Sequence, residues 1–171
     1  YLKSLQMVCS IRLAEETDVK RVAQLSQRTN QFNLTTRRCT ETDIRQMLQS
    51  TDWNIYVLGL KDKFGDNGTV GLALVQKQMN TWHIDTFLMS CRVIGRQAED
   101  ALVDRICRDA LAAGSKTVIA EYIKTQKNSL VSDFWDKMNF TKTTADENTA
   151  HYQRNLGNYT PAVFEYLKFE Q

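Results

Sequence analysis

The chain has 171 residues, of which 42% are hydrophobic and 25% are charged, and its formal net charge is +2. These values are ordinary for a globular domain, and a chain of this length buries a core without help from disulfides or metals. The 22 basic and 20 acidic residues are interspersed, so they form no basic stripe of the kind that binds nucleic acid. The composition therefore predicts one domain with no nucleic-acid partner.

The cysteines and histidines do not have the spacing of a metal site. The four cysteines form no CxxC pair, and the two histidines stand far from each other and from every cysteine in sequence. We therefore expect no metal. No apolar run approaches the ~18 residues of a membrane span, and the first residues lack the pattern of a signal peptide. These features lead us to expect a cytoplasmic protein with reduced thiols and no membrane partner.

The first third of the chain predicts a strand, a helix, a loop and a second helix. Apolar residues alternate over residues 9–13, and Thr17 or Asp18 is placed to cap a helix that runs to about residue 27. Residues 28–38 hold amides, hydroxyls and arginines but few apolar side chains, which predicts a loop outside the core that faces a polar group. Residues 40–43 have the pattern of a capping box, and a short helix follows them.

The middle of the chain predicts three strands and a long helix. Residues 53–60, 69–76 and 82–89 are rich in β-branched and aromatic residues. No helical pattern separates them, so we expect them to pair antiparallel. Residues 96–113 carry an apolar stripe at helical spacing, and Gly114 is placed to end that helix.

The last third predicts a strand, a helix and a closing hairpin. Residues 116–122 form the strand, and Asn128 is placed to cap a helix whose apolar face continues to Met138. Residues 140–144 and 150–155 predict the hairpin, and the residues after 157 form a tail that packs back on the domain. The order predicts an α+β domain of three layers, with a mixed central sheet flanked by helices.

This order of elements resembles the GNAT acyltransferase fold over almost the whole chain. In that family a loop of the form R/Q-x-x-G-x-G/A precedes the long helix and holds the pyrophosphate of coenzyme A. The first four positions match here, and Gln97 departs from the small residue that the motif ends on. The resemblance implies that coenzyme A or a phosphopantetheine arm is bound by Arg92, Val93, Ile94, Gly95, Arg96, Gln97 and Ala98.

General helix chemistry gives this loop a physical basis. The first N–H groups of a helix lack intrahelical partners and carry partial positive charge, so an anionic phosphate fits there. Arg92 and Arg96 would add charge-assisted hydrogen bonds. The alternative is an ordinary turn from strand to helix, in which Gly95 serves only the backbone angle.

A narrower resemblance connects the chain with the C-terminal GNAT-like half of FkbH-like proteins. Four segments carry it, namely residues 28–38 (RTNQFNLTTRR), 63–66 (KFGD), 84–96 (IDTFLMSCRVIGR) and 120–123 (AEYI). FkbH-like proteins join a haloacid-dehalogenase-type domain to this half. The resemblance implies a role in making glyceryl carrier-protein thioesters for methoxymalonyl-type extender units of polyketide biosynthesis.

The same resemblance suggests how the chain is organised and what it binds. We expect residues 1–171 to form a single GNAT-like domain, with residues 1–6 as a linker from an N-terminal dehalogenase-type domain and residues 157–171 as a packed tail. The implied partners are an acyl carrier protein and that dehalogenase-type domain of the same protein.

Two acidic residues are the candidate catalytic groups. Asp85 and Glu121 lie in expected strands that, in a GNAT fold, splay apart beside the acyl thioester. Either carboxylate could serve as a general base, and the alternative for each is a carboxylate paired with an arginine. GNAT enzymes frequently place a tyrosine in the last helix as general acid. Trp135 stands in that stretch and has no ionisable proton, which favours packing in the core.

The polar side chains of the loop at residues 28–38 suit a hydroxylated acid or a phosphate as substrate. The alternative is a loop whose polar groups satisfy its own backbone. The candidate substrate-binding residues are Asn30, Gln31, Asn33, Arg37, Arg38 and Asn128. Two hypotheses follow for the chain. The first is a domain that handles an acyl or glyceryl thioester of coenzyme A or a carrier protein. The second is a non-catalytic module that docks the carrier protein.

Overall fold

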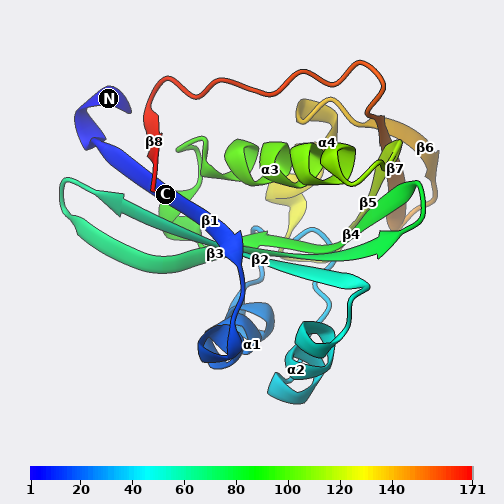
Figure 1. Ribbon diagram of the computed structural model, residues 1–171, viewed down its shortest axis with the longest axis horizontal. Coiled ribbons are helices and arrows are strands. Elements are labelled where there is room, and N and C mark those ends of the chain that lie inside the picture. The colour runs from blue at the N-terminus through cyan, green and yellow to red at the C-terminus, as the bar shows by residue number, and fades with distance from the viewer. Residues whose placement is uncertain (171) are drawn as a thin grey trace.

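The computed structural model describes residues 1–170, and their strands form one mixed sheet (Figure 1). The sheet has eight strands in the order β6-β7-β5-β4-β3-β2-β1-β8. The strands are β1 (Met7–Leu13), β2 (Trp53–Asp62), β3 (Gly65–Gln78), β4 (Thr81–Met89), β5 (Thr117–Ile123), β6 (Thr141–Ala145), β7 (Thr149–Asn155) and β8 (Leu167–Phe169). The α-helices are α1 (Val19–Arg28), α2 (Glu41–Gln49), α3 (Ala98–Ala112) and α4 (Phe134–Lys137).

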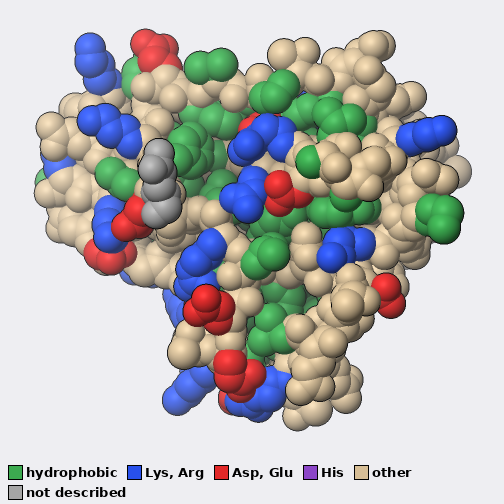
Figure 2. Space-filling model, viewed as in Figure 1, with side chains coloured by type: hydrophobic (Ala, Val, Ile, Leu, Met, Phe, Trp, Pro, Cys, Tyr) green, Lys and Arg blue, Asp and Glu red, His purple; other side chains and the backbone are tan. Residues whose placement is uncertain are grey.

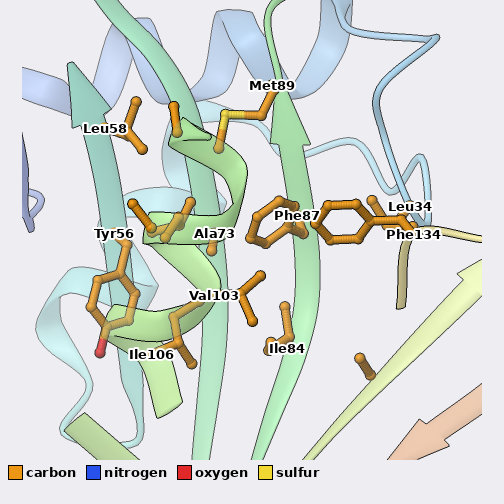
Figure 3. Close-up of a cluster of buried hydrophobic side chains, with 14 of the residues drawn as sticks. Leu34, Tyr56, Leu58, Ala73, Ile84, Phe87, Met89, Val103, Ile106 and Phe134 are labelled. Carbon is orange, nitrogen blue, oxygen red and sulfur yellow. The ribbon is translucent and has the colours of Figure 1, made fainter. Parts of the chain in front are cut away.

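Helices cover both faces of the sheet, which confirms the expected α+β class. In Figure 1, α1 and α2 lie below the sheet and α3 lies above it. The larger core lies between α3 and the sheet, where residues from β2, β3 and β4 meet Val103 and Ile106 of α3 (Figure 3). A second core lies between the sheet and the apolar faces of α1 and α2.

Local sequence signals confirm several expected boundaries. The Thr40 hydroxyl accepts a hydrogen bond from the N–H of Asp43, and the Asp43 carboxylate accepts one from the N–H of Thr40, as a capping box requires. Gly114 follows α3 with a φ of +86°, a backbone conformation that favours glycine. Strands β2, β3 and β4 pair antiparallel, as the missing helical pattern between them predicts.

The expected helix from Asn128 to Met138 is wrong in its extent. The structure has a 3-10 turn at Ser129–Val131 and only four α-helical residues in α4. Asn128 does not cap that turn, because its side-chain oxygen accepts from the N–H of Thr125, which precedes it. The apolar spacing is real, since Val131, Phe134 and Trp135 are all buried.

The expectation that residues 28–38 lie outside the core is wrong for their central part. Phe32, Asn33, Leu34 and Thr35 are all buried. Phe32 and Leu34 belong to the α3-side core, and the ring of Phe32 packs against Phe134 with ring centroids 5.3 Å apart. The many polar side chains in this stretch predict an exposed loop, although the backbone of its central part pairs with the sheet.

The C-terminal residues cross the α3 face and return to the far edge of the sheet (Figure 1). The Tyr159 hydroxyl and the N–H of Ala162 both donate to the carboxylate of Asp104 on α3. β8 then pairs parallel with β1. The sequence pattern did not predict β8. None of the helices in residues 1–170 has the length and apolar character to cross a membrane.

Candidate functional site

Strands β4 and β5 pair over only four residues and then diverge. The parallel pairing joins Thr81–Ile84 of β4 with Thr117–Ala120 of β5. Directly after Ile84, β4 contains a bulge, because Val75 of β3 lies opposite Ile84 while Leu74 lies opposite Thr86, which leaves Asp85 as the extra residue. A bulge bends its strand and increases the local twist, so β4 leaves β5 at this point.

The gap between the diverging strands is filled by the chain itself. On the β4 side, the N–H of Leu34 donates to the carbonyl of Phe87 at 3.1 Å, and the N–H of Met89 donates to the carbonyl of Phe32 at 3.0 Å. On the β5 side, the N–H of Ile123 donates to the carbonyl of Leu34 at 2.8 Å. Residues 32–34 therefore act as a short extra strand between β4 and β5, and we call residues 32–35 the inserted segment.

Asn128 fastens the inserted segment to β5. Its side chain is fully buried, and its NH₂ group donates to the carbonyls of Asn33 at 3.0 Å and Ile123 at 2.9 Å. Its side-chain oxygen accepts from the N–H of Thr125 and from the hydroxyl of Tyr122. All the hydrogen-bonding groups of this amide are used, so the expected substrate-binding residue Asn128 holds the backbone together.

Arg37 brings the two candidate catalytic carboxylates together. Its guanidinium lies 2.9 Å from an Asp85 carboxylate oxygen and 3.2 Å from a Glu121 carboxylate oxygen. It also donates to the carbonyl of Asp85, which the bulge exposes to it. The structure thus shows for both carboxylates the arginine pairing that the sequence left open as the alternative to a general base.

Glu121 is the centre of a cluster that also contains both histidines. The Nε2 atom of His83 lies 2.9 Å from one carboxylate oxygen, and the Nδ1 atom of His151 lies 4.0 Å from the other. Burial by itself would raise the pKa of Glu121, but the Arg37 charge and the His83 hydrogen bond outweigh it, so the pKa lies below its usual value. Glu121 and both histidines line an open cavity of about 500 Å³ on the sheet face opposite α3.

Replacing Arg37 by glutamine should change both stability and its pH dependence. The Arg37 side chain is 37% exposed, so we expect a loss of only about 1 kcal/mol at neutral pH. Because the folded-state pKa of Glu121 is lowered, its contribution is present above the unfolded pKa of about 4.3 and is lost as the pH falls through the folded value. The substitution should therefore reduce the drop in the free energy of unfolding between neutral and acid pH.

Urea unfolding at about pH 7 and about pH 3 measures both effects. Arg45→Gln is the matched control, because the carboxylates that pair with Arg45 are exposed and its removal should change stability by less than about 0.5 kcal/mol. If the free energy of unfolding of Arg37→Gln had the same pH dependence as that of the unchanged chain, Arg37 would not lower the pKa of Glu121.

In the expected phosphate-binding loop, residues 92–98, the carboxyl group of Glu99 contacts the backbone. The Glu99 side chain is 9% exposed and accepts from the N–H of Gly95 at 3.1 Å. Burial raises the pKa of Glu99, and the hydrogen bond from Gly95 opposes only part of that effect. The N–H groups of Arg92 and Val93 are also used, by the hydroxyl and the carbonyl of Ser90.

The other residues of the loop have equally local roles. Arg96 forms an ion pair with Asp62 at 2.7 Å, and Val93 and Ala98 are fully buried. Gln97 takes a left-handed φ of 67°, the conformation that a glycine at this position would adopt without strain. Ile94 lines, with Gly95, a cavity of about 380 Å³ next to α4.

The cavity beside this loop is acidic. Glu99, Asp100 and Asp133 contribute carboxyl groups to its wall, and Lys137, the only lysine or arginine among the described residues of the wall, already forms an ion pair with Asp133 at 3.3 Å. Burial raises the pKa of Asp100 as well. A phosphate placed in this cavity would face carboxyl groups, which disfavour a second negative charge.

The remaining candidates of the polar loop bind neighbouring parts of the chain. The Asn33 amide donates to the carbonyl of Thr29, and Arg38 donates to Asn30 and to the carbonyls of Ser26 and Thr29. The Gln31 side chain accepts from the thiol of Cys91 at 3.2 Å. The contacts of Asn33 and Arg38 with backbone carbonyls match the alternative in which the loop satisfies its own backbone.

Two groups of residues at the site are not among the candidates that the sequence predicts. His83 and His151 lie far apart in sequence, yet both meet Glu121 because β4, β5 and β7 are neighbours in the sheet. Glu99 is the second, because its carboxyl group accepts from the N–H of Gly95. Its spacing of four residues from Gly95 was the available signal, since a side chain at that distance can reach back to an N–H before the helix.

No protein-family model and no curated protein matches the chain. Solved structures match it over most of their length. The ribosomal-protein-S18-alanine N-acetyltransferase from Escherichia coli is 12% identical with a TM-score of 0.66, covering 91% of this chain and 99% of that one. Ard1 from Thermoplasma volcanium is 16% identical with a TM-score of 0.65, covering 86% of this chain and 97% of that one.

A third neighbour bears the family name in its description. It is a Desulfovibrio desulfuricans protein described as a GNAT-family acetyltransferase, 12% identical with a TM-score of 0.63, covering 87% of this chain and 99% of that one. At these identities the likeness establishes the fold and nothing finer. The chain has the GNAT fold, as the order of elements predicts.

The GNAT fold implies coenzyme A, so the fit of the site to that cofactor can be tested on these residues. The cofactor's pyrophosphate would meet Glu99 at the start of α3, and its thioester arm would meet the inserted segment between β4 and β5. The inserted segment fills the second position, and Glu99 takes the N–H of Gly95 at the first. In the arrangement that the structure shows, the residues between β4 and β5 do not fit the thioester arm of coenzyme A.

Proposed function

We propose that this chain is the GNAT-like half of an FkbH-like protein, and that it docks an acyl carrier protein for the dehalogenase-type domain without transferring the acyl group itself. The observation that best supports this proposal is the filled gap between β4 and β5. The backbone groups of Phe87, Met89 and Ile123 that border the gap already have partners in residues 32–34. A pantetheine arm finds no unpaired backbone there to bind.

The state of the candidate acids and bases supports a docking role as well. A general base needs a free carboxylate with a raised pKa, whereas Asp85 and Glu121 are both paired with Arg37 and the pKa of Glu121 is lowered. The indole N–H of Trp135 donates to the carbonyl of Glu121 at 3.1 Å, and indole has no proton to give to a leaving thiolate. The carrier protein as the partner rests on the FkbH-like segments of the sequence.

Calorimetry with the isolated chain tests the proposal. We expect binding of a holo acyl carrier protein with a Kd in the micromolar range, about −8 kcal/mol, which is typical of a transient complex. We expect coenzyme A to bind at least about a hundredfold more weakly than the holo carrier protein, and we expect no transfer of an acyl group from a carrier thioester. Glu121→Gln should bind the carrier protein as the unchanged chain does.

Two results would contradict docking without catalysis. One is binding of coenzyme A with an affinity similar to that of the holo carrier protein. The other is acyl transfer by the isolated chain that disappears in Asp85→Asn or Glu121→Gln. Absence of any carrier-protein binding would remove the proposed partner.

A second candidate function is thioester chemistry at Glu121. The observation that favours it is the cavity of about 500 Å³ in which Glu121 meets His83 and His151. A carboxylate with a histidine at 2.9 Å can orient the imidazole and stabilise its charged form, which suits proton transfer. Here the acyl group of a carrier thioester would be expected to move to an acceptor, and His83→Asn would abolish that transfer while leaving carrier binding intact.

A further inference from the structure

A second open cavity of about 500 Å³ lies where the end of α1 meets the end of β4. It is on the α1 side of the sheet, whereas the cavity at Gly95 and Glu99 is bordered by α3 and α4 residues. The polar residues that line it are Arg21, Arg28, Thr29, Asn30, Gln31, Ser90 and Cys91. Among the described residues that line it, none is an aspartate or a glutamate.

The positive charge at this cavity is not neutralised by the chain. Arg21 is held by hydrogen bonds to the side chain of Gln24 at 2.8 Å and to the carbonyl of Thr69 at 3.1 Å, both of which are neutral. Arg28 and Arg92 also form no ion pair within residues 1–170. Arg21 and Arg28 line the cavity, and the Nε atom of Arg92 lies 3.4 Å from the hydroxyl of Ser90, which lines it too. Burial lowers the pKa of Arg21, and the positive charges of Arg92 and Arg28 lower it further.

The neutral groups around these arginines still have hydrogen bonds to donate. The side-chain oxygens of Asn30 and Gln31 are used as acceptors, by Arg38 and Cys91, while their NH₂ groups have no acceptor among the described residues. The Ser90 hydroxyl accepts from Arg92 and likewise donates to no described residue. Donors outnumber acceptors here, which is the arrangement that suits an oxyanion.

We propose that this cavity binds the phosphate group of a small phosphorylated molecule, a phosphate monoester. A phosphate monoester is close to doubly negative at neutral pH, and guanidinium groups bind its oxygens through paired hydrogen bonds. The amides of Asn30 and Gln31 would then face hydroxyl or carbonyl groups of the remainder of the molecule. This inference goes beyond the proposed function, because it needs neither a carrier protein nor coenzyme A.

Phosphorus NMR and calorimetry with the isolated chain test the proposal, using inorganic phosphate, glycerol 3-phosphate and glycerol as probes. We expect glycerol 3-phosphate to bind more tightly than inorganic phosphate, and glycerol not to bind. In the double variant Arg28→Gln/Arg92→Gln, the affinity for glycerol 3-phosphate should fall at least about tenfold, equivalent to about 1.4 kcal/mol. Both side chains are exposed, so the variant should stay folded, which its circular dichroism checks.

The control is Arg45→Gln, which removes an arginine that is already neutralised by Glu16 and Glu41 and should leave binding unchanged. Equal affinity in the double variant and the unchanged chain would overturn the proposal. So would inorganic phosphate that binds as tightly as the ester, or no binding of glycerol 3-phosphate at up to about 10 mM, the range of a weak site. Carrier-protein binding does not enter any of these measurements, so failure here is distinct from failure of the docking proposal.

Discussion

Replacing Trp135 by alanine is expected to lower the free energy of unfolding by about 4 kcal/mol, the largest effect of a single substitution that we predict. The side chain is 1% exposed, and its ring packs against Phe87, Phe134 and Phe140 with centroid distances of 5.5, 5.0 and 4.9 Å. Alanine would leave a cavity among these rings, and the surrounding side chains can only partly collapse into it.

Urea unfolding measures this loss, with two variants for comparison. Trp135→Phe keeps an aromatic ring but removes the N–H that donates to the carbonyl of Glu121, so it should lose about 1 to 2 kcal/mol. Met79→Ala is the control, because Met79 is 91% exposed and its truncation should change stability by less than about 0.5 kcal/mol. A loss below about 1 kcal/mol for Trp135→Ala would contradict a structural role for this residue.

The second large effect is expected for Asn128→Ala, which should lower the free energy of unfolding by about 3 kcal/mol. The substitution leaves the carbonyls of Asn33 and Ile123 and the N–H of Thr125 without their buried side-chain partner. It also frees the inserted segment on its β5 side. The backbone N–H of Ile123, which donates to Leu34, should therefore exchange with solvent faster than in the unchanged chain.

Hydrogen exchange and urea unfolding of Asn128→Ala distinguish this role from surface binding. Asn148→Ala is the matched control, since Asn148 is exposed and its side chain forms no hydrogen bond with the described residues. We expect the control to match the unchanged chain in both measurements. If Asn128→Ala did so too, the amide would not fasten the inserted segment, and a role in substrate binding would regain support.

The filled gap connects the fold with the proposed function. A GNAT-like sheet is useful for thioester chemistry because β4 and β5 diverge, and here the bulge at Asp85 still makes them diverge. The inserted segment then uses the backbone groups that the divergence exposes. The fold is retained while the space beside its two diverging strands is closed, and this closure supports our proposal of docking without acyl transfer.

Charges of both signs are mixed on the face of the molecule that Figure 2 shows, which agrees with binding at local sites. Figure 2 shows Lys and Arg side chains next to Asp and Glu side chains on the face in view. Unneutralised positive charge is found at the cavity of Arg21 and Arg28, in a small area near the end of α1. A phosphate group matches an area of that size better than an extended polyanion does.

Apart from β8, the order of elements and the α+β class could be predicted from the sequence alone, and the GNAT fold came from a family resemblance. The elements follow from local patterns, such as the capping box at Thr40 and the β-branched runs of β2, β3 and β4, which depend only on residues close in the sequence. The alternation of Cys9, Ile11 and Leu13 likewise marked β1.

The tertiary structure alone decided what the candidate site contains. Arg37 meets Glu121 across 84 positions of sequence, and Asn128 meets Asn33 across 95. Backbone pairing of residues 32–34 with β4 and β5 depends on carbonyl and N–H groups that every residue has, so no side-chain pattern marks it. The same arginine, asparagine and glutamate side chains serve in substrate sites and in internal ion pairs, and only their neighbours in space distinguish the two roles.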